Sequence, residues 1–340
     1  MNSQERFDRT TAGRPLVSVV IPVFNERAVL PVLHQRLDSV LGPLPVRYEL
    51  VLVDDGSTDG SGQYLVDLAQ RVPGVRAVRL SRNFGKEAAL TAGIEHARGD
   101  AIIVIDADLQ DPPELIPQML SAWQDGADVV AMKRRSRAGE TALKRWSAHV
   151  FYRLLSRISA VDIPHDTGDF RLMSRKAVEA LSRLPERNRY MKGLFAWIGL
   201  PTKVIEYDRA PRAAGHSQWD YLSLFRLAFE GITSFSVAPL RLAMVLGALI
   251  AVGGVLFGAW IILKTLVLGE VVPGYPSMIA MMTVLGGTQL LSIGLLGEYV
   301  GKIYFEAKQR PVYLVRDITV SVREGQRPVF RDVKGTRHVA

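Results

Sequence analysis

Short apolar runs alternate with longer amphipathic segments from residue 17 to about residue 133. The short runs are rich in β-branched residues and end at polar turns, as is typical of buried parallel strands. The expected strands are Val17–Val23, Tyr48–Val53, Val75–Leu80, Ala101–Ile105 and Asp128–Met132, with a later one at Thr202–Tyr207. The expected helices cover Ala28–Leu41, Gly60–Arg71, Lys86–Ala97 and Pro113–Gln124. This alternation predicts an α/β domain with a mainly parallel sheet and helices on both faces.

Two later segments contain no charged residue, one between Arg241 and Lys264 and the other between Glu270 and Glu298. About 20 apolar residues are needed to cross the hydrocarbon core of a bilayer, and each segment reaches that length. We therefore expect two transmembrane helices. The connection near Leu266–Pro276 is short and contains proline and glycine, which favours a hairpin.

Basic and amphipathic segments flank the expected spans. The flanking cations are Arg212, Arg226, Arg241, Lys302, Lys308, Arg310 and Arg316. They place both ends of the chain in the cytoplasm, because cytoplasmic flanks carry the excess of Lys and Arg. Trp219–Phe235 favours an interfacial helix, whereas Glu140–Ile158 suits either a surface helix or a membrane contact. The tail after Lys308 alternates apolar residues and predicts short strands, packed on their own domain or on a neighbouring subunit.

Composition narrows the range of partners. The 340 residues include no cysteine, so a disulfide framework or thiolate metal site is excluded. The formal net charge of +8 suits nucleic acid, anionic lipid or phosphorylated substrates. We expect no nucleic-acid partner, because no helix-turn-helix, zinc or RNA-binding motif is present. Met1–Pro15 is polar, lacks the apolar core of a signal peptide and is expected to be flexible.

Two acidic turns are the strongest chemical signal. Asp106 and Asp108 follow a buried strand directly, and Asp54 and Asp55 follow an earlier one. Ligands of open α/β sheets bind beyond the carboxyl ends of the strands, where paired carboxylates can hold Mg²⁺ or Mn²⁺ against a diphosphate. A solvated acidic turn is the alternative. If the two strands are near neighbours in the sheet, the turns lie side by side.

Three segments in combination resemble the family 2 glycosyltransferases, which have the GT-A fold. The segments are Ser18-Val19-Val20-Ile21-Pro22-Val23-Phe24-Asn25-Glu26, Val53-Asp54-Asp55-Gly56-Ser57-Thr58-Asp59 and Asp106-Ala107-Asp108-Leu109-Gln110-Asp111-Pro112-Pro113. Within the family the chain is most similar to polyprenyl-phosphate glycosyltransferases, such as dolichyl-phosphate mannose synthases and bacterial polyisoprenyl-phosphate glucosyltransferases. The resemblance implies a flexible N-terminus (1–15), a GT-A catalytic domain (16–212), juxtamembrane amphipathic helices (213–238), two transmembrane helices (239–301) and a cytoplasmic tail with short strands (302–340).

The resemblance also implies roles on the donor side. The implied metal ligands for Mg²⁺ or Mn²⁺ are Asp106, Asp108 and Gln110, of which Asp108 is the surest. The implied nucleotide-sugar contacts are Pro22, Phe24, Asn25, Glu26, Asp54, Asp55, Asn83, Lys86, Asp106 and Ala107. Two alternatives remain. Glu26 could instead be a charge that stabilises a helix N-terminus, and the segment around Asn83 could be a solvated loop.

The acceptor side requires cations rather than a strong base, since a phosphate monoester is already anionic near neutral pH. The candidate acceptor-phosphate residues are Lys133, Arg134, Arg137, Arg212 and Ser217. Arg212 and Ser217 match the family's Arg-x-x-Gly-x-Ser element, and the basic cluster after Met132 could instead bind anionic lipid heads. Asp169 occupies the place of the family's catalytic carboxylate. We expect it to act beside Asp108 and Arg134 by orienting the acceptor or a basic residue.

The resemblance implies an inverting, metal-dependent enzyme that moves one hexose from a nucleotide sugar to polyprenyl phosphate at the bacterial inner membrane. UDP-glucose is the preferred donor, because Asn83-Phe84-Gly85-Lys86-Glu87 and the two expected spans look most like the bacterial glucosyl branch, with GDP-mannose and an amino-arabinose donor as alternatives. A homo-oligomer, such as a tetramer, is expected, and lipopolysaccharide modification is an implied pathway. A non-catalytic membrane scaffold is disfavoured by the intact acidic turns. A processive synthase is disfavoured by the missing Gln-x-x-Arg-Trp motif.

Overall fold

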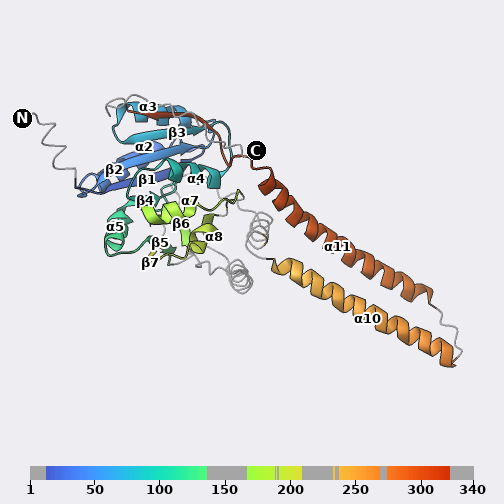
Figure 1. The fold of residues 1–340 in the computed structure, drawn as a ribbon. Coiled ribbons are helices and arrows are strands. Elements are labelled where there is room, and N and C mark those ends of the chain that lie inside the picture. The colour runs from blue at the N-terminus through green and yellow to red at the C-terminus, as the bar shows by residue number, and fades with distance from the viewer. Residues whose placement is uncertain are drawn as a thin grey trace, which may run out of the picture.

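The computed structural model describes residues 13–135, 167–187, 189, 191–208, 233, 237–268 and 274–321. An α/β domain lies at one end, and two long helices project from it side by side (Figure 1). The chain after the second of these helices returns to the sheet. Segments far apart in the sequence therefore meet at the edge of the sheet.

The domain is organised around an eight-stranded mixed sheet in the order β7-β5-β6-β4-β1-β2-β3-β8. The strands are β1 (Leu16–Val23), β2 (Arg47–Asp54), β3 (Val75–Leu80), β4 (Ala101–Val104), β5 (Val129–Arg134), β6 (Thr167–Ser174), β7 (Thr202–Tyr207) and β8 (Val315–Val320). β1 pairs in parallel with both β2 and β4, β2 with β3, and β5 with β7. The predicted α/β fold with a mainly parallel sheet is confirmed.

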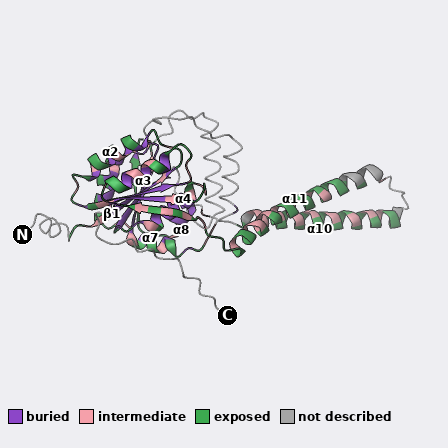
Figure 2. Ribbon diagram, turned by 90° about the horizontal axis from the view of Figure 1, so that it is seen from above, coloured by how far each residue is buried: buried purple, intermediate pink, exposed green. Residues whose placement is uncertain are grey.

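Helices cover both faces of this sheet. They are α2 (Leu30–Leu41), α3 (Ser61–Arg71), α4 (Lys86–His96), α5 (Ile116–Gln124), α7 (Arg175–Ser182) and α8 (Met191–Trp197), with a short 3₁₀ turn at Pro113–Leu115. Side chains of α2, α3 and α5 join one apolar core, and those of α4, α7 and α8 join the other. In β1 the alternation of side chains sends Val19 and Ile21 into the first core and Val20 into the second. Figure 2 shows the buried strands between layers of more exposed helices.

Two antiparallel strands complete the sheet. β6 lies between β4 and β5, with which it pairs antiparallel, and it was not among the expected strands. β8 adds to the free edge of β3, and Arg79 binds Asp317 across that pair with an N···O distance of 2.7 Å. The tail therefore packs on its own domain, which resolves the choice that the sequence left open.

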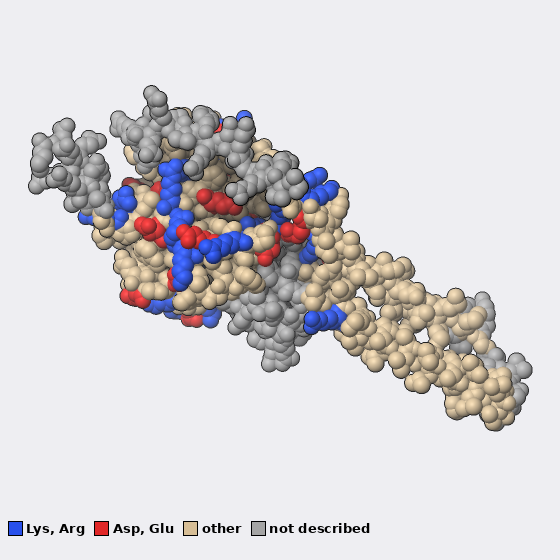
Figure 3. Space-filling view, in the orientation of Figure 1, with Lys and Arg blue, Asp and Glu red and all other residues tan. Residues whose placement is uncertain are grey.

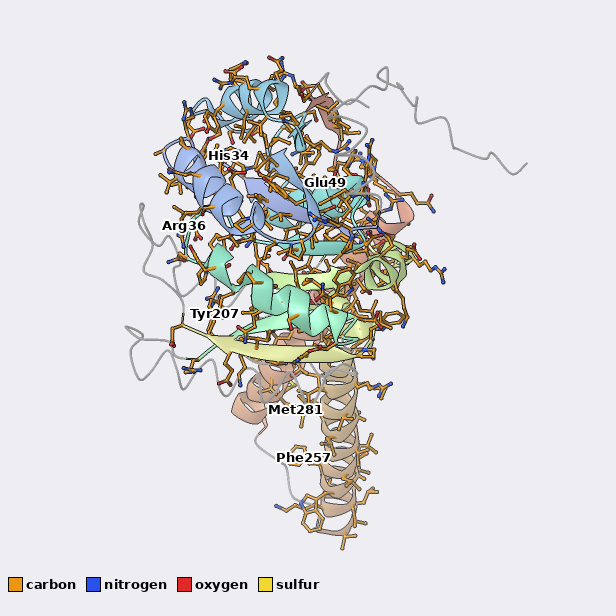
Figure 4. The ribbon with its side chains drawn as sticks, turned by 90° about the vertical axis from the view of Figure 1, so that its left-hand side faces the viewer. His34, Arg36, Glu49, Tyr207, Phe257 and Met281 are labelled. Carbon is orange, nitrogen blue, oxygen red and sulfur yellow. The ribbon has the colours of Figure 1, made fainter. Side chains whose placement is uncertain are left out.

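The projecting helices are α10 (Ala238–Leu268) and α11 (Tyr275–Ala307). They lie against each other (Figure 4, where Phe257 marks α10 and Met281 marks α11), and most of their apolar side chains are exposed. By length and composition, Pro239–Val267 in α10 is the one helix in the described part of the chain that is long and apolar enough to cross a membrane. The prediction of a second span stays a prediction. The expected interfacial segments 140–158 and 219–235 lie outside the described residues, except for Thr233.

Gly93 lets α4 approach the sheet closely. A Cβ atom at this position would lie 2.3 Å from Val20 Cγ1 and 3.1 Å from Val53 Cγ2. Gly93→Val is therefore expected to lower the free energy of unfolding by about 3 kcal/mol, because the well-packed core cannot accept the added carbons. Thermal melting of the purified protein measures this effect. The matched control is Gly253→Val on α10, where a Cβ meets nothing within 4 Å; equal melting temperatures for both variants would contradict the close-packing argument.

Candidate functional site

A pocket of about 250 Å³ opens where β1, β2 and β4 end. These three strands are neighbours in the sheet and run parallel, so the turns that follow them meet at one edge. The residues after β1 supply Phe24 and Glu26, those after β2 supply Asp55, and those after β4 supply Asp106 and Asp108. The two acidic turns predicted from the sequence therefore lie side by side.

The turns after β1 and β2 hold each other in place. The Asn25 backbone N–H donates to Ser57 Oγ at 3.0 Å, and Asn25 Oδ1 accepts from the Thr58 N–H at 2.8 Å. Asn25 has φ 55°, a left-handed conformation that asparagine tolerates well. The buried Asp54 accepts from the Ser57 N–H at 3.0 Å. Asn25 and Asp54 thus brace the rim of the pocket without lining it.

Asp55 connects the pocket to the loop before α4. Its carboxylate accepts from the Phe84 N–H at 2.7 Å and from the Gly85 N–H at 2.9 Å. Burial raises the pKa of Asp55, and these two backbone donors oppose the rise. Gly56 has φ 71°, and a Cβ there would lie 2.5 Å from the backbone carbon of residue 82. The loop that carries Asn83 into the pocket is thus fixed against the β2 turn.

The turn after β4 has a strained backbone at Leu109, and burial of the Leu109 side chain holds it in place. Leu109 has φ 59°, a conformation that costs a leucine roughly 1–2 kcal/mol, and its side chain is buried in the core. Asp108 is 8% exposed and accepts from the Gln110 N–H at 3.1 Å. The strained turn therefore points Asp106 and Asp108 into the pocket, as strained backbone often does at functional sites.

Lys86 connects the pocket to a second acidic group. Its ammonium lies 2.6 Å from Asp106 Oδ1 and 2.6 Å from Asp169 Oδ2. Burial alone would lower the pKa of Lys86, but Asp106 and Asp169 outweigh burial and raise it. For Asp169, burial would raise the pKa, but Lys86 and further cations hold it at about 2. Lys86 and Asp169 are therefore both ionised at neutral pH.

A group of charged side chains surrounds Asp169 on β6 and extends to α8. Arg171 is buried, donates to the Gly168 carbonyl at 2.7 Å and lies 3.7 Å from the centroid of the Phe195 ring on α8. Glu87 accepts from the backbone N–H of Met191, and burial raises the pKa of Glu87 to about 7. This group, Lys86, Glu87, Asp169, Arg171 and Lys192, is called the Asp169 cluster below.

Arg134 reaches the same region from the end of β5. Its side chain hydrogen-bonds to Tyr207 on β7, and the Tyr207 hydroxyl donates to buried Asp111 at 2.5 Å. Burial and Asp111 raise the pKa of Tyr207, so the hydroxyl stays protonated. Figure 4 labels Tyr207, the last residue of β7. Lys133, the preceding residue, pairs instead with Glu206 at 3.2 Å.

The donor set suits a divalent cation. Asp106 and Asp108 provide hard carboxylate oxygens on one turn, and magnesium commonly binds through one or two carboxylates together with substrate phosphates and water. The described residues contain no group of three or more His, Asp or Glu placed to hold a metal by themselves. A divalent ion such as Mg²⁺ or Mn²⁺ bound here would be held by these two carboxylates, with substrate phosphates or water completing its coordination.

The structure brings together most of the predicted donor-side residues. Those that line the pocket are Pro22, Phe24, Glu26, Asp55, Asn83, Lys86, Asp106, Ala107 and Asp108. Gln110 lies on the same turn as Asp108. The acceptor candidates Arg137, Arg212 and Ser217 lie outside the described residues. Glu87, Tyr207 and Lys192 were not identified as site residues from the sequence. Only Glu87 had a signal in the sequence, because it directly follows the predicted site residue Lys86.

Comparison with known proteins identifies the family. The glycosyl transferase family 2 model matches residues 18–182. An uncharacterised glycosyltransferase of Synechocystis sp. is 48% identical over 89% of this chain and 95% of its own length. The bactoprenol glucosyl transferase of Shigella phage SfV is 48% identical over 88% of this chain and 98% of its own.

A solved structure of glucosyl-3-phosphoglycerate synthase from Mycobacterium tuberculosis is 21% identical and covers 68% of this chain and 82% of its own. Its TM-score with this chain is 0.47. Each of the two relatives, by contrast, matches this chain at 48% identity over almost its whole length. The chain therefore belongs to glycosyltransferase family 2, and it is a glycosyltransferase.

Proposed function

We propose that the enzyme transfers one glucosyl residue from UDP-glucose to polyprenyl phosphate, with a divalent metal ion and with inversion at the anomeric carbon. The observation that carries this proposal is Lys86, which joins Asp106 in the pocket to Asp169 in a cationic cluster outside it. One side of that junction suits a nucleotide sugar and the other side suits an anionic acceptor. The name of the phage relative, a bactoprenol glucosyl transferase, agrees with this pairing.

On the donor side, we assign Asp106 and Asp108 to the metal ion, with Gln110 as a further ligand. The ion would neutralise charge on the diphosphate as it leaves. Asp55 and Asn83 lie where the nucleoside would bind, within the same pocket. Lys86 holds Asp106 in place and supplies a second positive charge near the diphosphate.

On the acceptor side, the phosphate oxygen attacks the anomeric carbon while the bond from that carbon to the diphosphate oxygen breaks, and the electron pair leaves with the diphosphate. A single displacement of this kind inverts the anomeric centre. No proton has to be removed, because the second pKa of a phosphate monoester is about 6. Arg134, held by Tyr207, is proposed to bind the acceptor phosphate, with Lys133, Arg137, Arg212 and Ser217 as further candidates.

The projecting helices support a membrane anchor. Apolar side chains on α10 such as Leu249 and Val255 are 64% and 71% exposed, and such a surface is unfavourable in water. On the face in Figure 3 the projecting helices are almost free of charge, and Lys and Arg lie where they leave the domain. We propose that α10 and α11 form a hairpin in the bacterial inner membrane, with the catalytic domain in the cytoplasm. Assembly into a homo-oligomer stays a prediction.

Incubation with labelled nucleotide sugars tests the function directly. Purified protein receives polyprenyl phosphate, Mg²⁺ or Mn²⁺, and labelled UDP-glucose, GDP-mannose or a UDP-amino-arabinose, and the lipid extract is counted. Label from UDP-glucose alone in the lipid fraction is the expected result, and EDTA should remove it. Label from GDP-mannose alone would overturn the donor assignment. Label that requires no polyprenyl phosphate would overturn the acceptor assignment.

The pH dependence gives a prediction about Asp169. Its pKa is about 2, because the surrounding cations outweigh burial, so Asp169 stays ionised at working pH and is a very weak base. Activity should therefore fall on the acidic side near pH 6, where the acceptor phosphate gains its second proton. The measurement is kcat/KM for the acceptor from pH 4.5 to 8. An Asp169→Asn variant that keeps substantial activity but shifts this acidic limb would contradict the assignment of the limb to the phosphate.

A further inference from the structure

Lys192 is a charged residue in the Asp169 cluster that the roles above do not use. It is the second residue of α8, and its side chain is only partly exposed. Its charged neighbours are Asp169, Lys86, Glu87 and Arg134. No hydrogen bond or ion pair is formed by the Lys192 ammonium with any residue that the structure describes.

The position of Lys192 is fixed by contacts of α8 with α4 and β6. The Glu87 carboxylate accepts from the Met191 N–H at the start of the helix, and Thr91 Oγ1 lies 3.9 Å from Met191 Sδ. Arg171 on β6 stacks on Phe195 one turn further along. The first turn of α8 is therefore docked against α4 and β6, and Lys192 is held beside Asp169.

The nearby carboxylates compensate this ammonium only in part. Asp169 already pairs with Lys86 at 2.6 Å, and burial keeps the pKa of Glu87 at about 7, so that Glu87 is partly protonated at neutral pH. Burial lowers the pKa of Lys192, and Asp169 and Glu87 offset only part of that fall. An anion bound beside Lys192 would favour its charged form further.

We propose that Lys192 binds the phosphate monoester of the lipid acceptor together with Arg134, and so completes the acceptor site. This inference rests on the proposed function. The acceptor is favoured over the donor diphosphate for a geometric reason. Lys192 is not among the described residues that line the nucleotide pocket, and Lys86 and Asp169 link that pocket to the cluster. Two cations on different elements, α8 and β5, would then hold one phosphate group.

The test compares Lys192→Met, Lys192→Arg and the control Lys176→Met. Lys176 is exposed and pairs with Asp128 at 2.8 Å on the surface. The expected result for Lys192→Met is a rise of about 10- to 100-fold in KM for polyprenyl phosphate, as for the loss of a hydrogen bond to a charged group. The KM for UDP-glucose should change less than twofold. Lys192→Arg should recover most of the acceptor affinity, and the control should match wild type.

A binding measurement separates this role from a structural one and from turnover. Titration calorimetry without donor uses geranyl phosphate as the probe, and wild type should bind it at least tenfold more tightly than Lys192→Met. The melting temperature of Lys192→Met should equal or exceed that of wild type, because a partly buried, unpaired charge has been removed.

Several results would overturn the inference: a KM effect on UDP-glucose alone, unchanged geranyl phosphate binding, or a large drop in melting temperature. Displacement of geranyl phosphate by equimolar inorganic phosphate would also overturn it, since the site would then recognise free phosphate. Binding of geranyl phosphate through Lys192 in a protein that transfers no glucose would reject glucosyl transfer and leave the lipid-phosphate site at Lys192 standing. An active Lys192→Met enzyme with a wild-type KM for polyprenyl phosphate would reject the role of Lys192 and leave the proposed function standing.

Discussion

Asp108→Asn is expected to lower the rate of glucosyl transfer by about 1,000-fold or more. The substitution keeps the size of the side chain and its acceptor for the Gln110 N–H, but it removes a charge aimed into the pocket. Removal of one preorganised charge-stabilising group typically costs 10²- to 10³-fold in kcat, and a lost metal ligand adds to that cost. Initial rates of label transfer to the lipid fraction, at several Mn²⁺ concentrations, measure the effect.

The control for this variant is Asp67→Asn on α3, whose carboxylate accepts from the exposed Gln63 side chain and does not line the pocket among the described residues. It should keep wild-type activity. Asp108→Asn should also keep the wild-type melting temperature within a few degrees. An Asp108→Asn enzyme with more than a tenth of wild-type activity at saturating Mn²⁺ would exclude Asp108 as a metal ligand.

Lys86→Met is expected to lower kcat/KM for both substrates by about 100-fold or more. The substitution removes the cation shared by Asp106 and Asp169 and leaves two largely buried carboxylates to repel each other. Because Lys86 is the largest opposing influence after burial on the pKa of Asp169, that pKa rises in the variant. Asp169 should therefore take up a proton at a higher pH in the variant than in the wild type.

Kinetics of Lys86→Met with each substrate varied in turn test this expectation, with Lys176→Met as the control for loss of a lysine. Lys86→Arg keeps the charge and should retain more activity than Lys86→Met. An effect confined to the KM for UDP-glucose would reduce Lys86 to a nucleotide contact. It would also remove the link between donor and acceptor sides on which the proposed function is built.

The parallel part of the fold could be predicted from the sequence because both faces of its strands are buried. Runs such as Val17–Val23 are apolar throughout, and the polar turns that follow them mark the strand ends. β6 was missed because Asp169 and Arg171 interrupt its apolar pattern, although Phe170 and Leu172 are fully buried. A central antiparallel strand that carries charges does not produce the pattern of a covered parallel strand.

The acidic turns were also predictable, because each follows its strand directly. The Asp169 cluster was not, because it joins α4, β6 and α8 through the order of strands in the sheet, which local sequence does not specify. Lys192 has no motif around it, and its neighbours Glu87 and Asp169 become visible only once β6 is placed next to β4. For α10 the uncharged run predicted a long apolar helix correctly, and the second membrane span stays a prediction.

The return of the chain from α11 to β8 restricts how this protein can be divided. Glu306 near the end of α11 accepts from the Arg187 N–H at 2.8 Å, and β8 forms the outer edge of the sheet beside β3. A water-soluble fragment made by stopping the gene before α10 would expose the β3 edge, with Arg79 deprived of Asp317 and an open strand prone to self-association. Useful truncation therefore means replacing the hairpin with a short linker that keeps residues 308–321.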